Sequence, residues 1–288
     1  MKERHATANG DRRLVQKLAY NSVKIGLDAT NSLFEVFHEN TKLGRLTARA
    51  YSTWIFNITR SRTNRQAMQA SLHQGQGYKA YTLMERRELP RVEARTELER
   101  TIVARRSIRD FSGAPMSLDE VTRLLFFTYG RTERSGTLRP VASGGALYPL
   151  EIYVVALKVD GLAPGVYHYG IETGHLDEVK PGECLDALKD VVFWQGIDID
   201  HAALAIVVTA AFTRNTIKYL DRGYRMILME AGEAAQNLCL LATSMDLGTC
   251  LLGGFNDDRL SEFLDIDGVD EAPLLPVLVG RLAAKNGS

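Results

Sequence analysis

A run of seven residues, RRSIRDF at positions 105–111, combines permanent positive charge with a small hydroxyl side chain. Its arginines are Arg105, Arg106 and Arg109, and Ser107 lies among them. A guanidinium presents a planar set of donors that fits a phosphate, so the run could hold a phosphorylated ligand. A solvated basic helix end has the same composition, because cations near a helix C-terminus are favourable. Taken by itself, the run favours this second interpretation.

A second polar stretch, RNTIKYLDRGYR at positions 214–225, separates an apolar run from a long helical pattern. Lys218 and Tyr219 are adjacent in it, with arginines nearby at positions 214, 222 and 225. Like charge or burial would favour the neutral amine of Lys218, which could then serve as a base near neutral pH. A surface loop with an extended, solvated lysine explains the same residues, and the sequence leaves both interpretations open.

Other common catalytic patterns are absent from the sequence. The six histidines do not pair with cysteines or carboxylates at zinc spacings, so no metal site is predicted. The nucleophile motif GxSxG, the phosphate loop GxxxxGK[ST] and the dinucleotide motif GxGxxG do not occur. The three cysteines form no CxxC pair, and two of them lie in apolar runs, which predicts reduced thiols. Hydrolase chemistry and metal chemistry are therefore disfavoured.

Composition is typical of a globular protein. The 288 residues are 45% hydrophobic and 24% charged, with 35 basic and 35 acidic side chains. The resulting net charge of zero argues against a surface made as a whole for nucleic acid or acidic membranes. The charged N-terminal residues are followed by no apolar segment of signal-peptide or membrane-spanning type. We expect a cytoplasmic protein without nucleic-acid or membrane partners.

Residues 1–95 show helical spacing in pieces and few strand signals, which predicts a helical N-terminal extension. Positions 40–84 contain no acidic residue. The basic side chains there are Lys42, Arg45, Arg49, Arg60, Arg62, Arg65 and Lys79. Interleaved aromatics at positions 51, 54 and 56 could suit single-stranded nucleic acid, an acidic peptide or a partner subunit. A solvated helix is favoured over nucleic acid, and contact with an acidic leader peptide is a further hypothesis.

Residues 96–288 are predicted to form an α+β domain, because helices and strands are mixed without regular alternation. A helix beginning near Glu97 ends at the basic run, and Ser117 with Glu120 is a capping box for a second helix that stops at Gly130. Buried strands are expected at 151–157, 166–169, 203–211 and 274–279, with helices at 183–192, 224–245 and after position 256.

Two glycine-containing stretches lie between these elements. RPVASGGALYP at 139–149 precedes a buried strand, and its adjacent glycines would let the backbone approach a ligand closely, because no Cβ intervenes. A plain loop before a strand is the alternative. LLGGF at 251–255 follows the longest predicted helix, for which Gly248 is the expected stop.

Taken in order, RRSIRDF, SGGALYPLEIYVV, GVYHY, KYLDRGYR with MEAGEAAQN, and GGF resemble the motifs of nitroreductase-like flavoproteins. The closer resemblance is to the SagB/McbC-type dehydrogenases, and it covers residues 97–281. It implies a nitroreductase-like central sheet flanked by helices, an intertwined homodimer, and FMN as the cofactor. Members of that group oxidise thiazolines and oxazolines in ribosomally made peptides and usually work with a cyclodehydratase.

The resemblance also implies ten cofactor contacts in three groups. The FMN phosphate and ribityl chain would be bound by Arg105, Arg106, Ser107 and Arg109. The isoalloxazine, held mainly by the other subunit, would be contacted by Ser143, Gly144 and Ala146. Additional flavin or phosphate contacts would come from Gly253, Gly254 and Arg281. Ala142 stands where the family commonly has proline.

Lys218 and Tyr219 match the lysine–tyrosine pair that azoline dehydrogenases of this group use in catalysis. The implied function is FMN-dependent oxidation of thiazoline or oxazoline rings in a modified peptide to thiazoles or oxazoles, with oxygen as the acceptor. Lys218 would act as the base and Tyr219 would position the ring, although the reverse assignment stays open. Two alternatives remain: an NAD(P)H-dependent nitro or quinone reductase, and a flavin-less scaffold of a peptide-modifying complex.

Overall fold

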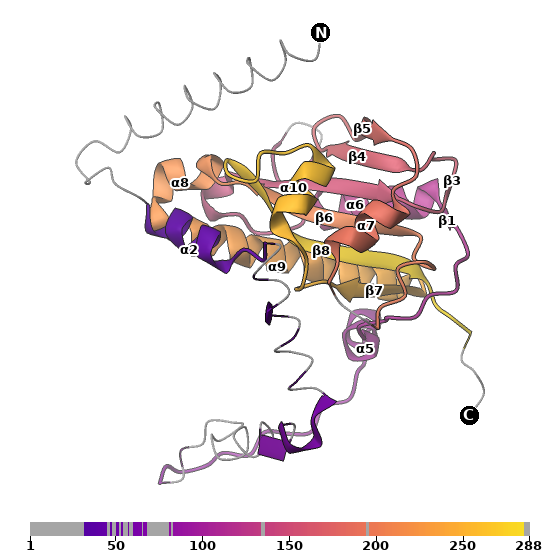
Figure 1. The fold of residues 1–288 in the computed structure, drawn as a ribbon. Coiled ribbons are helices and arrows are strands. Elements are labelled where there is room, and N and C mark those ends of the chain that lie inside the picture. The colour runs from indigo at the N-terminus through magenta and orange to yellow at the C-terminus, as the bar shows by residue number, and fades with distance from the viewer. Residues whose placement is uncertain are drawn as a thin grey trace.

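The computed structural model describes residues 32–44, 47, 50–51, 53, 57, 60–64, 66–67, 81, 83–133, 136–193 and 196–284. Their core is a six-stranded sheet in the order β5-β4-β2-β6-β8-β7, in which every neighbouring pair is antiparallel (Figure 1). The strands are β2 (Leu150–Ala156), β4 (Gly165–Gly170), β5 (His175–Pro181), β6 (Leu204–Ala211), β7 (Leu247–Leu251) and β8 (Glu271–Arg281). A separate parallel pair joins β1 (Met116–Ser117) to β3 (Val159–Asp160).

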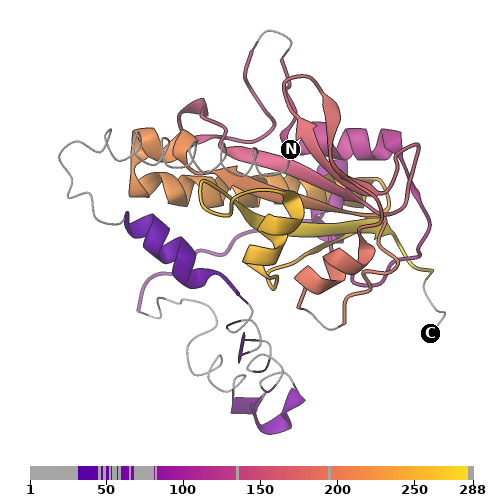
Figure 2. The same ribbon diagram turned by 45° about the horizontal axis from the view of Figure 1, so that its top comes forward.

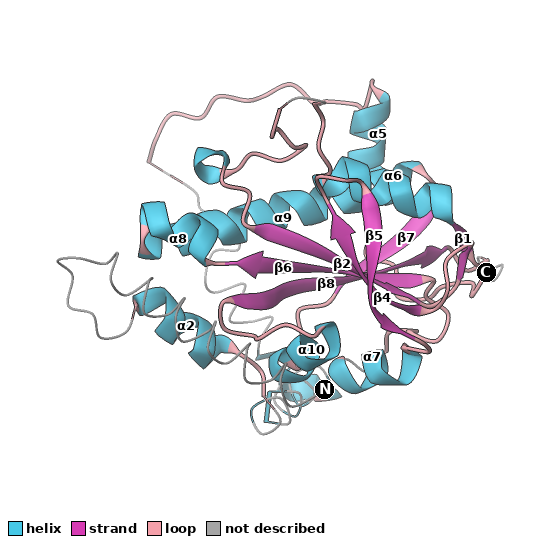
Figure 3. Ribbon diagram, turned by 90° about the horizontal axis from the view of Figure 1, so that it is seen from above, coloured by secondary structure: helices cyan, strands magenta, loops and turns pink. Residues whose placement is uncertain are grey.

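Helices cover both faces of the sheet. They are α2 (Leu33–Thr41), α5 (Glu97–Ala104), α6 (Leu118–Tyr129), the 3₁₀ helix η1 (Gly144–Ala146), α7 (Leu185–Val191), α8 (Thr213–Tyr219), α9 (Asp221–Ser244) and α10 (Asp257–Leu264). Figure 3 shows α6, α8 and α9 on one side of the sheet and α7 and α10 on the other. Each side has its own apolar cluster, because alternate residues of a strand point to opposite faces.

The central position of β6 follows from its sequence. Seven of its eight residues are buried, and none carries a charge. A strand that is apolar on both faces is stable where both faces of the sheet are covered. Strand β6 lies in the interior of the sheet, between β2 and β8. The predicted α+β class, with a central sheet flanked by helices, is confirmed by this arrangement.

Two expectations at the helix ends had different outcomes. The capping box at Ser117 and Glu120 is present, and α6 ends at Gly130 as predicted. Gly248 is not a helix stop, because α9 ends at Ser244 and Gly248 lies inside β7. An ideal Cβ on Gly248 would lie 2.8 Å from a side-chain methyl of Ile108, so the glycine serves a close packing contact instead.

Within residues 1–95, the predicted N-terminal extension, the structure describes helix α2, which lies beside α8 and α9 (Figure 2). Of the predicted basic segment, Lys42, Arg60 and Arg62 are described, whereas Arg45, Arg49, Arg65 and Lys79 lie outside the described residues. Positions 54 and 56 also lie outside them. Within the part of the chain that the structure describes, no helix combines the length and apolarity that crossing a bilayer requires.

Candidate active site

Helix α8 presents the adjacent side chains of Lys218 and Tyr219, called here the lysine–tyrosine pair. The stretch 214–225, for which the sequence left a surface loop and an active site open, forms the short helix α8 after β6, the turn at Leu220 and the first residues of α9. Lys218 is exposed, and its Nζ lies 5.1 Å from the centre of the Tyr219 ring. The helix ends at Tyr219, and the φ of 50° and ψ of −142° of its C-cap, Leu220, are unusual for a residue with a side chain.

The glycine loop, residues 143–146, meets the lysine–tyrosine pair. Gly145 has φ 69°, and an ideal Cβ there would lie 2.6 Å from Tyr219 Oη and 2.9 Å from Lys218 Nζ. A Cβ on Gly144 would lie 2.8 Å from Met226 Sδ. Two stretches more than seventy positions apart in the sequence thus converge, and the missing side chains of the glycines permit that convergence.

A buried hydrogen-bond network holds the glycine loop in place. Ser143 Oγ donates to Glu230 Oε2 at 2.6 Å, and Tyr129 Oη donates to Glu230 Oε1 at 2.5 Å. Ser143 Oγ in turn accepts from the Tyr148 N–H at 2.9 Å. The Leu150 N–H donates to Tyr129 Oη at 3.2 Å, which ties the first residue of β2 to the same network. Glu230 is only 1% exposed, so the loop is anchored on an interior carboxyl group.

The network places an acid and a cation close together in the interior. Burial raises the pKa of Glu230, and hydrogen bonds from Ser143 and Tyr129 oppose that rise. Burial also raises the pKa of Tyr129, and the Glu230 charge raises it further. The Arg139 guanidinium lies between two rings, 4.4 Å from the centre of Tyr129 and 4.6 Å from that of Tyr148. This cluster fixes the base of the loop by packing and by charge.

Sequence reasoning did not single out Glu230, Tyr129 or Arg139. The helical pattern contained a signal for Glu230. This acidic residue follows Ile227 by three positions and therefore lies on the face of the helix that was predicted to be apolar. A carboxylate on such a face needs a buried hydrogen-bonding partner. The identity of that partner could not be read from the pattern.

The basic run lies at the other end of α9. Arg105 is the C-cap of α5, as predicted, and the Ile108 N–H donates to Thr249 O of β7 at 2.8 Å. Burial raises the pKa of the Cys239 thiol against the opposing effect of Arg105, and Arg109 similarly opposes the rise at Cys250. Among the described residues, no carboxylate forms an ion pair with the arginines of this run.

Of the three other predicted contact residues, Gly253 and Gly254 follow β7, and Arg281 is the last residue of β8. Gly253 is exposed, with no atom within 4 Å of an ideal Cβ, and Gly254 O accepts from the Phe193 N–H. Arg281 Nη2 pairs with Glu120 Oε2 at 2.9 Å, and its Nε donates to Pro115 O at 3.0 Å. Arg281 therefore contacts the cap of α6, and its role as a phosphate contact stays a prediction.

The glycine loop and the basic run are separated along α9. Gly144 lies next to Met226, whereas Arg105 lies near Cys239. Because an α-helix rises 1.5 Å per residue, the helix advances about 20 Å between those two contacts. Within one chain, the two predicted parts of the cofactor site therefore lie at different points along the same helix.

Comparison with known proteins assigns this fold to a family. A model described as "Nitroreductase family" matches residues 102–281, which include the basic run, the glycine loop and the lysine–tyrosine pair. The chain belongs to the nitroreductase family. Membership supports an oxidoreductase activity. A protein of Methanocaldococcus jannaschii described as a nitroreductase is 39% identical over 199 residues, covering 67% of this chain and 95% of that protein.

Another relative is named for the processing of a microcin. The microcin B17-processing protein McbC of Escherichia coli is 27% identical over 169 residues, covering 57% of this chain and 62% of McbC. The fold matches a chain in the E. coli microcin synthetase McbBCD complex with truncated pro-MccB17 bound, with a TM-score of 0.61 and 23% identity over 75% of this chain and 82% of that chain. A nitroreductase structure from Anabaena variabilis matches with a TM-score of 0.57 and 31% identity, covering 65% and 38% of the two chains.

Proposed function

We propose that this nitroreductase-family chain is an FMN-dependent dehydrogenase that oxidises thiazoline or oxazoline rings of a ribosomally made peptide to thiazoles or oxazoles. The observation that carries the proposal is the contact between the lysine–tyrosine pair and the glycine loop. In the reductase alternative, no proton has to be removed from a ring carbon, so a paired lysine and tyrosine at the loop have no equivalent task. The relationship to McbC, a microcin B17-processing protein, supports a peptide substrate. A complex with other processing proteins, including a cyclodehydratase, is part of the proposal.

The basic run fits the phosphate end of FMN. Its three guanidiniums carry permanent charge without a carboxylate partner among the described residues, which is the donor set that a phosphate requires. Arg105, Arg106, Ser107 and Arg109 would hold that end of the cofactor. Ser143, Gly144 and Ala146 would face its ring, and the open space beside Gly253 leaves room for a further contact.

A homodimer is part of this proposal. In it, the basic run of one chain and the glycine loop of the other would hold one cofactor, which brings together two parts that lie about 20 Å apart along α9 within one chain. The exposed apolar side chains of α9, Leu228 and Met229, are available for such an interface. The site is then complete only in the dimer.

The chemistry divides between cofactor and protein. Aromatising an azoline removes a proton from the α carbon and a hydride from the neighbouring ring carbon. FMN, when bound, supplies the two-electron acceptor. Lys218 Nζ, when it is in its neutral form, would take the proton, and Tyr219 Oη would orient the substrate ring beside the loop. Exposure of Lys218 lets the proton pass to solvent after the reaction.

Turnover of an azoline-containing peptide by purified protein tests this proposal. The Lys218→Ala variant should retain the yellow colour of bound flavin and lose turnover by roughly 100-fold or more, the usual contribution of a general base. Lys189→Ala is the matched control, because Lys189 pairs with Asp200 away from the loop. A Lys218→Ala variant with full turnover would contradict the assignment.

A nitroreductase activity is the second candidate. The observation in its favour is the relative from M. jannaschii, which is more similar to this chain than McbC is and is described as a nitroreductase. Under this alternative, NAD(P)H reduces the flavin rapidly and an azoline peptide does not. Anaerobic reduction with each donor separates the two activities.

A further inference from the structure

Helix α2 packs against residues on both sides of α8. Phe34 and His38 are each 7% exposed, and their rings lie 5.8 and 4.8 Å from the ring of Phe212, the residue before α8. Phe34 also stacks on Tyr224, in the first turn of α9, at 5.6 Å. His38 Nδ1 lies 3.1 Å from Tyr224 Oη. One helix of the N-terminal extension therefore contacts both ends of the segment that carries the lysine–tyrosine pair.

Polar contacts fix the turn between α8 and α9. Ser32 Oγ donates to Asp221 Oδ1 at 2.6 Å, and the Phe34 N–H approaches the same oxygen at 3.4 Å. Asp221 follows Leu220, whose positive φ is unfavourable for a residue with a Cβ. Such a conformation persists where surrounding contacts determine it. The carboxylate of Asp221 links this turn directly to the start of α2.

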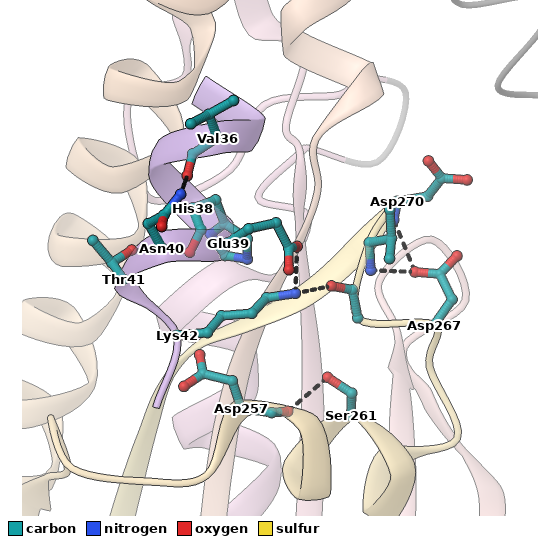
Figure 4. A network of polar contacts seen from close by, with 12 residues as sticks. Val36, His38, Glu39, Asn40, Thr41, Lys42, Asp257, Ser261, Asp267 and Asp270 are labelled. Carbon is teal, nitrogen blue, oxygen red and sulfur yellow. Dashed lines mark hydrogen bonds and ion pairs between the residues drawn. The ribbon is translucent and has the colours of Figure 1, made fainter. Parts of the chain in front are cut away.

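The C-terminal end of α2 is attached to a different part of the domain. Lys42 Nζ donates to Glu39 Oε1 and to Gly268 O, both at 2.6 Å (Figure 4). The Leu43 N–H donates to Asp257 Oδ2 at 2.9 Å, at the first residue of α10. The N-terminal end of α2 is thus anchored at the α8–α9 turn, and its C-terminal end is anchored at α10 and at the segment before β8.

We propose that residues 32–43 form a strap that sets the position of the lysine–tyrosine pair, with Asp221 as the positioning residue at its contact with the α8–α9 turn. Without the strap, Phe212 and Tyr224, which already contact each other, lose the rings of Phe34 and His38 that pack against both, and the turn at Leu220 loses its anchor. The short helix α8 then moves relative to the glycine loop. This inference rests on the proposed function, because it gives the strap a catalytic purpose.

Substitution of Asp221 tests the catalytic part. In the full-length protein, Asp221→Asn should lower kcat for an azoline peptide about tenfold, because a small displacement of a catalytic group is costly. The FMN affinity and the KM should stay within about twofold of the wild-type values, because none of the strap's described contacts involves the basic run or the glycine loop. Asp190→Asn is the matched control, because it makes the same change in an exposed ion pair with Arg259 and should leave kcat unchanged.

A second readout is independent of activity. Hydrogen exchange of the α8 amides and acylation of Lys218 by an amine-reactive ester, both mapped by mass spectrometry, should accelerate in Asp221→Asn and to a smaller extent in Ser32→Ala. If the wild type does not oxidise azolines, the proposed function fails while these measurements still test the strap. Unchanged exchange and labelling in both variants would overturn the strap. Faster exchange with unchanged kcat would overturn its positioning role. Ser32→Ala carries the same test if Asp221→Asn does not fold.

Discussion

The two groups of polar side chains along α9 are held in opposite ways. At the glycine loop, Glu230 accepts hydrogen bonds from Ser143 and Tyr129 and is almost completely buried. At the basic run, Arg106 and Arg109 are exposed and have no carboxylate partner among the described residues. The first group uses its polar atoms to shape a loop, whereas the second leaves its charge available to an anion.

Replacement of Glu230 should give the largest effect on stability. Glu230→Ala leaves the buried hydroxyl group of Tyr129 and the half-buried one of Ser143 without their acceptor and should lower the free energy of unfolding by about 3 kcal/mol. Denaturant titration measures the loss. Gln236→Ala, an exposed change on the same helix, should stay within about 0.5 kcal/mol of the wild type. Equal stability of the two variants would mean that the network does not hold the loop.

Replacement of the arginines should act on cofactor affinity and not on folding. Arg105→Ala and Arg109→Ala should each raise the Kd for FMN roughly 10- to 100-fold, the effect expected for losing a hydrogen bond between charged groups. The stability of the cofactor-free protein should change little, because no described ion pair is broken. Titration of flavin fluorescence gives the affinity, with Arg123→Ala on α6 as the control. Unchanged affinity in both variants would remove the basic run from the site.

Alanine substitutions at two glycines with similar φ distinguish the effect of backbone strain on stability from an effect on catalysis. Gly145 and Gly174 have φ of 69° and 72°, but only a Cβ at Gly145 would meet other side chains. Alanine at either position should cost about 1 kcal/mol of stability through its left-handed backbone. Only Gly145→Ala should also reduce azoline turnover, by roughly tenfold, because it displaces the lysine–tyrosine pair. A comparable loss of turnover in Gly174→Ala would show that general destabilisation is the cause.

The pH dependence of stability should show the smallest effect, with opposite responses in a variant at His38, inside the strap, and a variant at Asp257, on α10. Burial lowers the pKa of His38 to about 4 from 6.5, so its contribution to stability is lost as the pH falls from about 6.5 to 4. Burial raises the pKa of Asp257 to about 6 from 3.8, so its ionisation lowers stability as the pH rises from about 4 to 6. The nearby charges of Lys42 and Glu39 are common to all variants.

Melting temperatures at pH 7 and pH 5 test these signs. When the pH is lowered from 7 to 5, the melting temperature of Asp257→Asn should fall by roughly 2–4 °C relative to that of the wild type, because only the destabilising protonation of His38 remains. The melting temperature of His38→Phe should rise by a similar amount relative to that of the wild type, because only the stabilising protonation of Asp257 remains. If both variants follow the wild-type pH profile, neither group titrates in the way that its burial implies.

Much of the fold could be predicted because its signals are local. The capping box at Ser117, the fully apolar β6 and the apolar stripe of α9 each depend on neighbouring residues. The end of α9 was predicted wrongly, since Asp246 rather than Gly248 adopts the positive φ after the helix. Helix α8 was not predicted either, because its seven residues contain few apolar side chains and its stability depends on α2 and α9.

The residues of the candidate site could be proposed from the sequence, but their arrangement could not. Ordered motifs led to the basic run, the glycine loop and the lysine–tyrosine pair, and the roles of these residues stay predictions. The contact of Gly145 with Tyr219 and the network around Glu230 join distant segments, and a single sequence contains no signal for such pairings. The position of the strap against Asp221 is a further example of a long-range contact.

The central claim is that the lysine–tyrosine pair beside the glycine loop removes the proton of an azoline ring. Anaerobic mixing of the flavin-loaded protein with an azoline-containing peptide tests it most directly, with the visible flavin band as the signal. The wild type should bleach within seconds, and Lys218→Ala should keep its colour over the same time. Bleaching by NAD(P)H but not by the peptide, or equal bleaching of both proteins by the peptide, would contradict the claim.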